Sequence, residues 1–398
     1  MRRPARARRH ESILCAAIAF AVLVAGCSNA PRPTPSPQVT DVNAFLDDLE
    51  ERTFRWFWDV TDSTNGLTPD RWPTPSFHSI AATGFALTAY PIGVERGWVS
   101  REAAARRTAT TLRFLWTAPQ DSVASGVIGY KGLFYHFLEP EHGTRFKDVE
   151  LSTVDTALLF AGVLTCQSWF DGNTPDEITI RALADSLYLR ADWNWASPRA
   201  PLIGHGWTPE EGHLKWDWRG YNEAMLVYII ALGSPTHAPA PAAWDSWLDG
   251  YTWGTFEGQA HVGFAPLFGH HYSHVWVDFR GIRDSYMQTK GIDYFENSRR
   301  ATLSQRSYAI RNPMAFEGYG PDIWGLSACD GPVNGTVTIK GKPVEMATYR
   351  ARGVSYGDIR DDGTIAPTAA GGSIPFAPEF AIPALMAMKS AWGEHGYN

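Results

Sequence analysis

The sequence is poor in cysteine and in basic residues. Only 4 of its 398 residues are Cys, and they form no CxxC pair, which argues against a redox pair or a zinc site built from such pairs. The 42 acidic residues outnumber the 35 Lys and Arg residues, so the formal net charge is −7. A chain of this charge is a poor candidate for binding nucleic acid, because the phosphate backbone attracts basic surfaces.

The sequence also gives little support to several common enzyme classes. No P-loop is present, no GxGxxG opens a predicted helix, and we expect no nucleophile elbow of the serine hydrolases. The closest pattern to a metal site is the i, i+4, i+8 spacing of His270, His274 and Asp278. Because this segment has neither the Glu of an HExxH motif nor a Cys, hydrogen-bonded histidines are favoured, and we expect no metal or other cofactor.

The N-terminal apolar stretch, Ile13 to Val24, is shorter than the ~20 residues that a membrane-spanning helix needs. It follows an Arg-rich start and leads through small residues to Cys27, so residues 1–26 are predicted to be an export signal. The ending "LVAGC" resembles a bacterial lipobox, in which Cys27 becomes the lipidated first residue. Ordinary signal cleavage is the alternative.

Residues 27–40 contain "PRPTPSP" and are predicted to be a stiff, extended tether. The rest, residues 41–398, shows no second linker and is expected to be one domain. We therefore expect an exported monomer, periplasmic or held at the outer membrane by its lipid. Loss of residues 1–26 removes five Arg and one Glu and changes the formal charge from −7 to −11.

Two cysteines, Cys166 and Cys329, remain in the domain. A disulfide is conceivable in an oxidising compartment. However, Cys166 would lie about 14 residues into its helix and Cys329 about 7 into its own, a difference in depth of ~10 Å at 1.5 Å per residue. Since a disulfide needs Cα atoms within ~7 Å, both thiols are predicted to be free.

What the sequence does have is aromatic residues and helical periodicity. Its 17 Trp, 15 Tyr and 20 Phe lie in part beside Asp, Glu, Arg or Gly, a mixture that suits a carbohydrate cleft, where sugar faces stack on rings and hydroxyls bond to carboxylates. Amphipathic segments alternate with nearly uncharged ones, which predicts half-exposed outer helices and buried inner helices. The amphipathic segments are 41–60, 100–116, 176–192 and 291–310, the apolar ones are 79–94, 152–170, 221–233, 268–279, 322–328 and 376–392, and a Trp-rich segment near 243–253 is mixed.

This alternation gives about eleven helices, of which about six are uncharged, and predicts an all-α (α/α)6 barrel. A solenoid of helix pairs is the alternative, but no fixed-period repeat supports it. Residues 126–146 and 335–350 are predicted to be β-hairpins rich in Gly and aromatics. Long connections of this kind usually build functional sites.

In such a barrel the loops before the inner helices form one mouth, where acids and aromatics converge. Glu223 would lie in the first turn of an inner helix facing this mouth, or would merely be stabilised by the helix dipole. Asp155 completes an S/T-x-x-acid capping box with Ser152, so its role could be local. Glu150 precedes that cap and has no role in the helix, which slightly favours it over Asp155 as a catalytic carboxylate. Asp148 is a candidate substrate contact.

Four ordered segments resemble a known family: "VELSTVDTALLFAG" (149–162), "GYNEAMLVYIIALGSPTH" (220–237), "WGLSACDGP" (324–332) and "DDGTIAPTAAGGSIPFAPE" (361–379). They look like the glucoamylase-like domain of bacterial β-1,2-glucan enzymes, glycoside hydrolase family 144, which is related to a domain of cyclic β-1,2-glucan synthases. The resemblance spans roughly residues 41–394. It implies an (α/α)6 barrel, inversion, no metal, and linear β-1,2-glucan or sophoro-oligosaccharides as substrate. It also implies roles for Glu150, Asp155 and Glu223.

An inverting glycosidase pairs a protonated acid with a carboxylate that activates water, ~6.5 to 9.5 Å apart, so acids from neighbouring helix mouths suit it. Glu223 is therefore paired with Glu150 or Asp155. The candidate residues for stacking are Trp216, Tyr221, Tyr319 and Trp324, and those for hydroxyl contacts are Arg219, Arg280, Asp322 and Asp330. The rival hypotheses are a polysaccharide lyase, a non-catalytic glycan-binding lipoprotein, and a hydrolase of another glucan.

Overall fold

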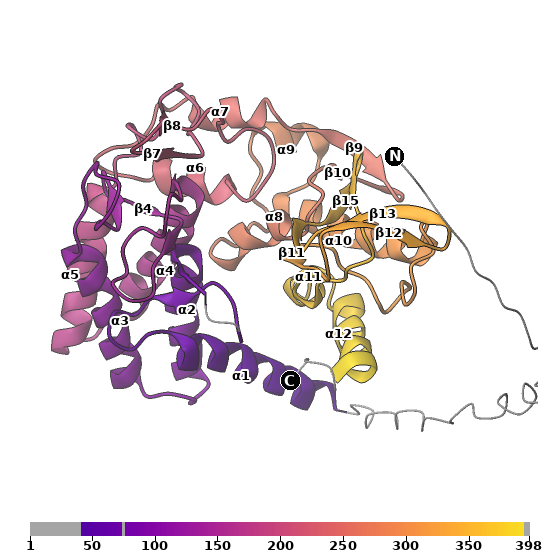
Figure 1. Cartoon of the computed structure of the whole chain (residues 1–398), viewed down its shortest axis with the longest axis horizontal. Helices are drawn as coiled ribbons and strands as arrows, with labels where there is room; N and C mark the ends of the chain where they lie inside the picture. The colour runs from indigo at the N-terminus through magenta and orange to yellow at the C-terminus, as the bar shows by residue number, and fades with distance from the viewer. Residues whose placement is uncertain (1–40, 74–75, 394–398) are drawn as a thin grey trace, which may run out of the picture. The chain divides into compact units, whose positions relative to one another are not determined.

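The computed structural model describes residues 41–73 and 76–393, which belong to the unit Val39–Asn398. This part of the chain is mostly helical and carries small antiparallel sheets (Figure 1). Its helices are α1 (Val42–Val60), α2 (Ile80–Glu95), α3 (Arg101–Thr117), α4 (Thr153–Trp169), α5 (Pro175–Arg190), α6 (Met225–Leu232), α7 (Ala243–Leu248), α8 (Phe268–His271), the 3-10 helix η1 (Tyr272–Val275), α9 (Ser285–Lys290), α10 (Tyr294–Arg311), α11 (Pro367–Gly372) and α12 (Pro378–Trp392). The predicted export signal (residues 1–26), the lipidated Cys27 and the predicted tether (residues 27–40) lie outside the described residues.

The strands are short and belong to six sheets among the described residues. Strands β1 (Thr68–Pro69), β2 (His78–Ser79) and β5 (Phe137–Leu138) form one sheet, and β3 (Gly129–Tyr130), β4 (Leu133–Tyr135), β6 (Leu151–Ser152), β7 (Gly206–Thr208) and β8 (Gly212–His213) form a second. The other four sheets are the pairs β9 (Trp253–Phe256) with β10 (Gln259–Val262), β11 (Ala328–Asp330) with β14 (Tyr349–Ala351), β12 (Gly335–Ile339) with β13 (Lys342–Met346), and β15 (Gly353–Ser355) with β16 (Asp358–Arg360). Both predicted hairpins are confirmed, as β3–β4 and β12–β13.

Buried helices alternate with half-exposed ones in the first half of the chain. Helix α4 buries most of its length, including its first-turn Asp155, whereas α3 and α5 bury one side only and lie outside α2 and α4 (Figure 1). Helices α2 and α4 pack so tightly that a Cβ at Gly84 would lie 2.3 Å from the Leu158 carbonyl oxygen. Small residues let the backbones touch, and this contact fixes the two helix starts relative to each other.

The buried apolar residues form one large cluster around α2, α4 and α6 and a second cluster around α10, α11 and α12. Phe45 of α1 belongs to the second cluster and Phe54 to the first, so α1 contributes to both. No helix in the described part of the chain is long and apolar enough to cross a membrane.

Two helix predictions need correction. Residues 322–328 are not helical: the chain is irregular there and runs into β11, and Gly325 adopts φ +122°, which a right-handed helix cannot contain. Residues 268–279 form only the short α8 and η1. The prediction for the cysteines is confirmed: both Cys166 and Cys329 are free thiols.

Candidate active site

Two buried helices begin side by side, each directly after a short strand. Strand β2 ends at Ser79, whose hydroxyl accepts a hydrogen bond from Ala82 N at 3.2 Å and caps α2. Strand β6 ends at Ser152, whose hydroxyl accepts from Asp155 N at 3.3 Å and caps α4. Ser152 therefore caps α4 as predicted, but the side chain of Asp155 accepts from the Ser152 hydroxyl and not from its backbone N–H, so the reciprocal bond of a full capping box is not formed.

His136, between β4 and β5, joins these two helix starts through its backbone. Its carbonyl accepts from the N–H of Ile80, the first residue of α2, at 3.3 Å. Its own N–H donates to the carbonyl of Glu150, just before β6, at 2.9 Å. The side chain of a residue held in this way must lie at the mouth where α2 and α4 begin.

The imidazole of His136 contacts two of the predicted catalytic carboxylates. Its Nδ1 lies 2.9 Å from Oε1 of Glu150, and its Nε2 lies 3.5 Å from Oδ2 of Asp155. The same Oδ2 of Asp155 accepts a hydrogen bond from the hydroxyl of Ser152. The ring also stacks on Phe137, with ring centroids 3.9 Å apart. The structure thus brings together Glu150 and Asp155 around a histidine that the sequence interpretation missed.

Burial and the neighbouring charges shift the pKa of each of the three groups. Burial opposes protonation of His136, but the charges of Asp155 and Glu150 outweigh it and raise the pKa of the imidazole to about 9. Burial would raise the pKa of Glu150, yet the hydrogen bond and charge of His136 hold this pKa below its ordinary value. For Asp155 burial prevails, and its pKa is raised despite His136 and Ser152.

Glu223 lies in a turn two residues before the start of α6 at Met225, and not in the first helical turn as predicted. Its Oε2 is buried and has no hydrogen-bond partner in the described structure. Burial raises the pKa of Glu223 to about 7, and the charge of Asp155 adds to this effect. Asp155 and Glu223 are therefore close enough to interact, and Glu223 is the carboxyl group best suited to carry a proton at neutral pH.

The sequence interpretation also missed two tyrosines: Tyr272 lies near Asp155 and Glu223, and Tyr349 lies near Tyr272 and the pair of Arg71 and Asp330. Burial raises the pKa of Tyr272, in η1, and the charges of Tyr349, Glu223 and Asp155 raise it further. Tyr349, in β14, is largely exposed. The site thus receives groups from α4, the turn before α6, η1 and β14, which are segments far apart in the sequence.

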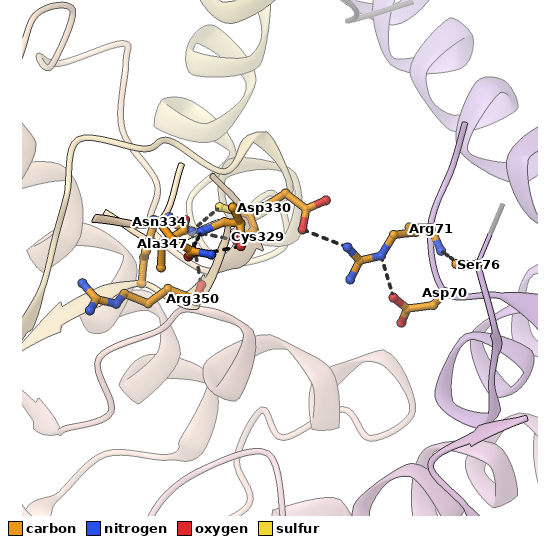
Figure 2. Close-up of polar contacts among 10 residues, drawn as sticks. Asp70, Arg71, Ser76, Cys329, Asp330, Asn334, Ala347 and Arg350 are labelled. Carbon is orange, nitrogen blue, oxygen red and sulfur yellow. Dashed lines mark hydrogen bonds and ion pairs between the residues drawn. The ribbon is translucent and has the colours of Figure 1, made fainter. Parts of the chain in front are cut away.

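An ion pair joins the N-terminal and C-terminal segments beside this site. Arg71 Nη1 lies 3.4 Å from Asp330 Oδ1, while its Nε donates to Asp70 Oδ2 at 3.1 Å, and Figure 2 shows Arg71 and Asp330 reaching toward each other from separate segments. Asp70 also contributes to the raised pKa of His136. Both members of the pair are substantially exposed, so a ligand could compete for them.

Behind Asp330, strand β11 is held by a fully buried arginine. Arg352 Nε donates to Asp362 Oδ1 at 2.6 Å, and neither side chain is exposed. The same guanidinium donates to the carbonyls of Cys329 at 2.7 Å and Ala347 at 2.8 Å. The position of Asp330 is therefore fixed by a buried network, although Asp330 itself is exposed.

The other predicted substrate contacts fall into two groups. The first group is exposed, and its side chains form no hydrogen bond in the described structure; it consists of Asp148, Trp216, Arg219 and Asp322. The second group already forms side-chain hydrogen bonds: Arg280 forms a bidentate pair with Asp278, and the hydroxyl of Tyr319 donates to Asp361 at 2.7 Å. Nothing in the described structure connects these residues to the three carboxylates.

Two stacking predictions are wrong. Tyr221 is 5% exposed and packs among Tyr251, Tyr294 and His270, and Trp324 is fully buried in the second apolar cluster. Neither ring presents a free face to a sugar. Trp216, by contrast, is 70% exposed, and only the fold separates it from the two buried rings.

Other patterns in the sequence have local explanations. His270 Nε2 lies 3.1 Å from the carbonyl of Phe264, and His274 Nε2 lies 3.0 Å from the hydroxyl of Ser298. Residues 353–357, "GVSYG", match the GxSxG pattern of a nucleophile elbow. However, Ser355 is buried in the β15–β16 hairpin rather than exposed between a strand and a helix, so the match is not a nucleophile elbow.

Two cavities of about 520 and 850 Å³ lie away from these acids. The smaller is lined by parts of α4 and α6, and the larger by α1, the later part of α2 and α11. Their walls are mainly apolar and include none of Glu150, Asp155 and Glu223. The chemical groups therefore identify the candidate site better than cavity size does.

Comparison with known proteins supports a carbohydrate-active fold. Residues 215–398 match the Glycoamylase family model, described as "Putative glucoamylase". The chain is 28% identical over 392 residues to an exo β-1,2-glucooligosaccharide sophorohydrolase (non-reducing end) from Parabacteroides distasonis. This alignment covers 89% of the chain but only 50% of the relative, so the chain spans about half the length of that curated protein.

Solved structures are similar over most of the chain. A "putative glucoamylase" from Bacteroides uniformis is 29% identical with a TM-score of 0.77, covering 90% of this chain and 84% of that one. An endo-β-1,2-glucanase from Chitinophaga pinensis is 26% identical with a TM-score of 0.73, covering 89% and 83%. These similarities confirm the resemblance predicted from the sequence, to proteins with a glucoamylase-like domain that include β-1,2-glucan hydrolases.

Proposed function

We propose that the protein is a glycoside hydrolase that cleaves β-1,2-glucan or sophoro-oligosaccharides. The observation that carries this proposal is the carboxyl group of Glu223, whose Oε2 is buried without a hydrogen-bond partner in the described structure, together with the carboxylates of Glu150 and Asp155 at His136. The names of the similar proteins support the substrate, since they include an endo-β-1,2-glucanase and a β-1,2-glucooligosaccharide hydrolase.

In this mechanism Glu223 is the general acid. Its raised pKa of about 7 keeps a proton available for the leaving oxygen at neutral pH. One of the carboxylates at His136 is the general base that activates water on the other face of the sugar, which gives inversion. Glu150 is favoured because it is more exposed than Asp155 and its pKa is held low.

Exposed polar and aromatic groups would bind the sugar rings. Trp216 offers a free aromatic face, and Asp148, Arg219, Asp322 and Asp330 offer charged groups for hydroxyls. A β-1,2-linked chain is bent, so scattered contacts from separate loops suit it better than a row of coplanar rings. We also propose that loops close one end of the substrate cleft, so that the enzyme releases short products.

The architecture and location complete the proposal. We infer a full (α/α)6 barrel, because buried α2, α4 and α6 alternate with half-exposed α1, α3 and α5. The protein is proposed to be a monomer that is exported and anchored by lipid on Cys27. Cell fractionation of the wild type and Cys27→Ala tests the anchor, since only the wild type is expected in the membrane fraction.

The activity is tested with purified protein on a panel of glucans. Linear β-1,2-glucan should release reducing sugar of α configuration by NMR, whereas activity only on starch or laminarin would contradict the substrate. Glu223→Gln should lose ~10²- to 10⁴-fold in turnover, the usual contribution of a general acid. The control is Glu102→Gln, an exposed first-turn glutamate of α3, which should keep wild-type turnover.

The rival functions give different outcomes in the same assay. A glycan-binding protein without catalysis would bind β-1,2-glucan, for example by calorimetry, and release no reducing ends. A lyase would raise the ultraviolet absorbance of a uronate polymer during digestion. Either result would replace the proposed function.

A further inference from the structure

We propose that His136 is a positioning residue that holds Glu150 and Asp155 as an oriented, ionised pair, through a hydrogen bond from Nδ1 to Glu150 and through the charge of the protonated ring, whose Nε2 lies beside Asp155. This inference rests on the proposed function and adds a residue that neither the motifs nor the similar proteins point to. His136 does not itself need to touch substrate. It acts through the carboxylate that activates water.

The first argument is the fixed placement of the ring. The backbone of His136 is tied on one side to Ile80, at the start of α2, and on the other to Glu150, before β6. The ring stacks on Phe137, and its two nitrogens lie 2.9 Å from Glu150 Oε1 and 3.5 Å from Asp155 Oδ2. A ring held at its backbone, face and both nitrogens has little freedom to turn away from either carboxylate.

The second argument is the number of donors. A neutral imidazole has one N–H, and its other nitrogen is an acceptor, which would repel a carboxylate lone pair. The protonated ring has two N–H donors and satisfies both carboxylates at once. Two carboxylates on opposite nitrogens of one ring are therefore consistent with an imidazolium.

The third argument is the charge that surrounds the ring. The charged groups that face His136 are Asp155 from α4, Glu150 before β6 and Asp70 after β1, and all three favour its protonation, whereas burial opposes it. Without the ring's positive charge, Glu150 and Asp155 would repel each other and one of them would take up a proton. A protonated carboxyl group cannot activate water.

The kinetic test compares His136→Gln with the wild type across pH on β-1,2-glucan. The acid limb of the kcat/KM profile reports protonation of the base. In the variant this limb should move to higher pH by roughly one pH unit or more, because the positive charge of the imidazolium beside the base is gone. At neutral pH kcat should fall at least about tenfold with KM little changed. The control is His213→Gln, which removes a half-buried histidine packed on Trp195 that bonds no carboxylate, and its profile should match the wild type.

A second kinetic comparison separates positioning from simple structural support. Glu150→Gln removes the partner whose ionisation His136 maintains, so adding His136→Gln to it should cost far less activity than His136→Gln costs alone. Fully additive losses, or an acid limb that stays in place in His136→Gln, would overturn the proposal.

A titration by NMR tests the inference without any activity and without the variant of His136. The imidazole resonances of the wild type should titrate well above the ordinary histidine range, and Glu150→Gln should lower that midpoint by roughly one pH unit or more. If the protein cleaves no glucan, the proposed function fails while this titration still decides the role of His136. If the protein is active but His136 titrates near its ordinary pKa, the inference fails and the function stands.

Discussion

Gly162 of α4 lies directly against the backbone of Gly84 in α2: a Cβ added to Gly162 would be 2.1 Å from the carbonyl oxygen of Gly84. Since these helices carry the caps Ser79 and Ser152, their contact sets the spacing of the candidate site. The obstacle is backbone rather than a flexible side chain, so it cannot move aside cheaply.

We therefore expect Gly162→Ala to lower the free energy of unfolding by about 1 to 3 kcal/mol or more through overpacking. Gly371→Ala is the control, because a Cβ there meets nothing within 4 Å and the helix α11 should gain slightly from Ala. Urea titration measures both. Equal stability of the two variants would show that α2 and α4 can separate without cost.

The two serine caps offer a matched comparison. Ser79→Ala should cost ~1 kcal/mol, the ordinary value of an N-cap. Ser152→Ala should cost more, by about 1 kcal/mol or above, because it also removes the hydroxyl donor to the buried carboxylate of Asp155. Denaturant unfolding of both variants checks this. Equal losses would mean that Asp155 does not depend on Ser152.

The buried pair of Arg352 and Asp362 should matter more than an exposed one. Arg352→Met leaves the carboxylate of Asp362 buried without its partner and is expected to cost about 3 to 5 kcal/mol. Arg360→Met, which removes an exposed pair with Asp358, should cost less than about 1 kcal/mol. Thermal unfolding would contradict this picture if the two variants melted at the same temperature.

Glu223 should make stability depend on pH. Its folded pKa of about 7 exceeds the ordinary 4.5, so its favourable contribution is complete below pH 4.5 and is lost as the pH rises through 7. Glu223→Gln removes this loss and should be more stable than the wild type above pH 7, by roughly 3 kcal/mol at 1.36 kcal/mol per pKa unit.

Glu150→Gln is the control of opposite sign. The pKa of Glu150 is lowered in the folded protein, so its stabilising contribution is present above pH 4.5 and is lost as the pH falls through the folded pKa. The variant should therefore be less stable than the wild type at neutral pH. Unfolding curves at pH 4, 6 and 8 would refute both assignments if neither difference changed with pH.

The two thiols should differ in reactivity. Cys166 is fully buried, its Sγ donates to the carbonyl of Leu87 at 3.1 Å, and burial raises its pKa to about 12. Cys329 is only half-buried, so it should be alkylated first in the native protein. In denaturant without reductant both should react. A mass unchanged by alkylation under those conditions would reveal a disulfide.

The sequence by itself determined the local features of this protein. Helical periodicity located α1 to α5, α10 and α12, and the Gly-containing turns located the hairpins β3–β4 and β12–β13. The capping of α4 by Ser152 was also predictable. Each of these depends on residues a few positions apart, where the period of the helix or the geometry of a turn decides the outcome.

Only the tertiary structure decided which of the polar groups meet. Strand pairing placed His136 against Glu150, and the contact between Arg71 and Asp330 joins residues 259 positions apart. Burial in the folded chain separated Tyr221 and Trp324 from the exposed Trp216. Such relationships arise from long-range packing, and the pKa of Glu223 follows from them because it depends on the water and charges that packing removes or brings near.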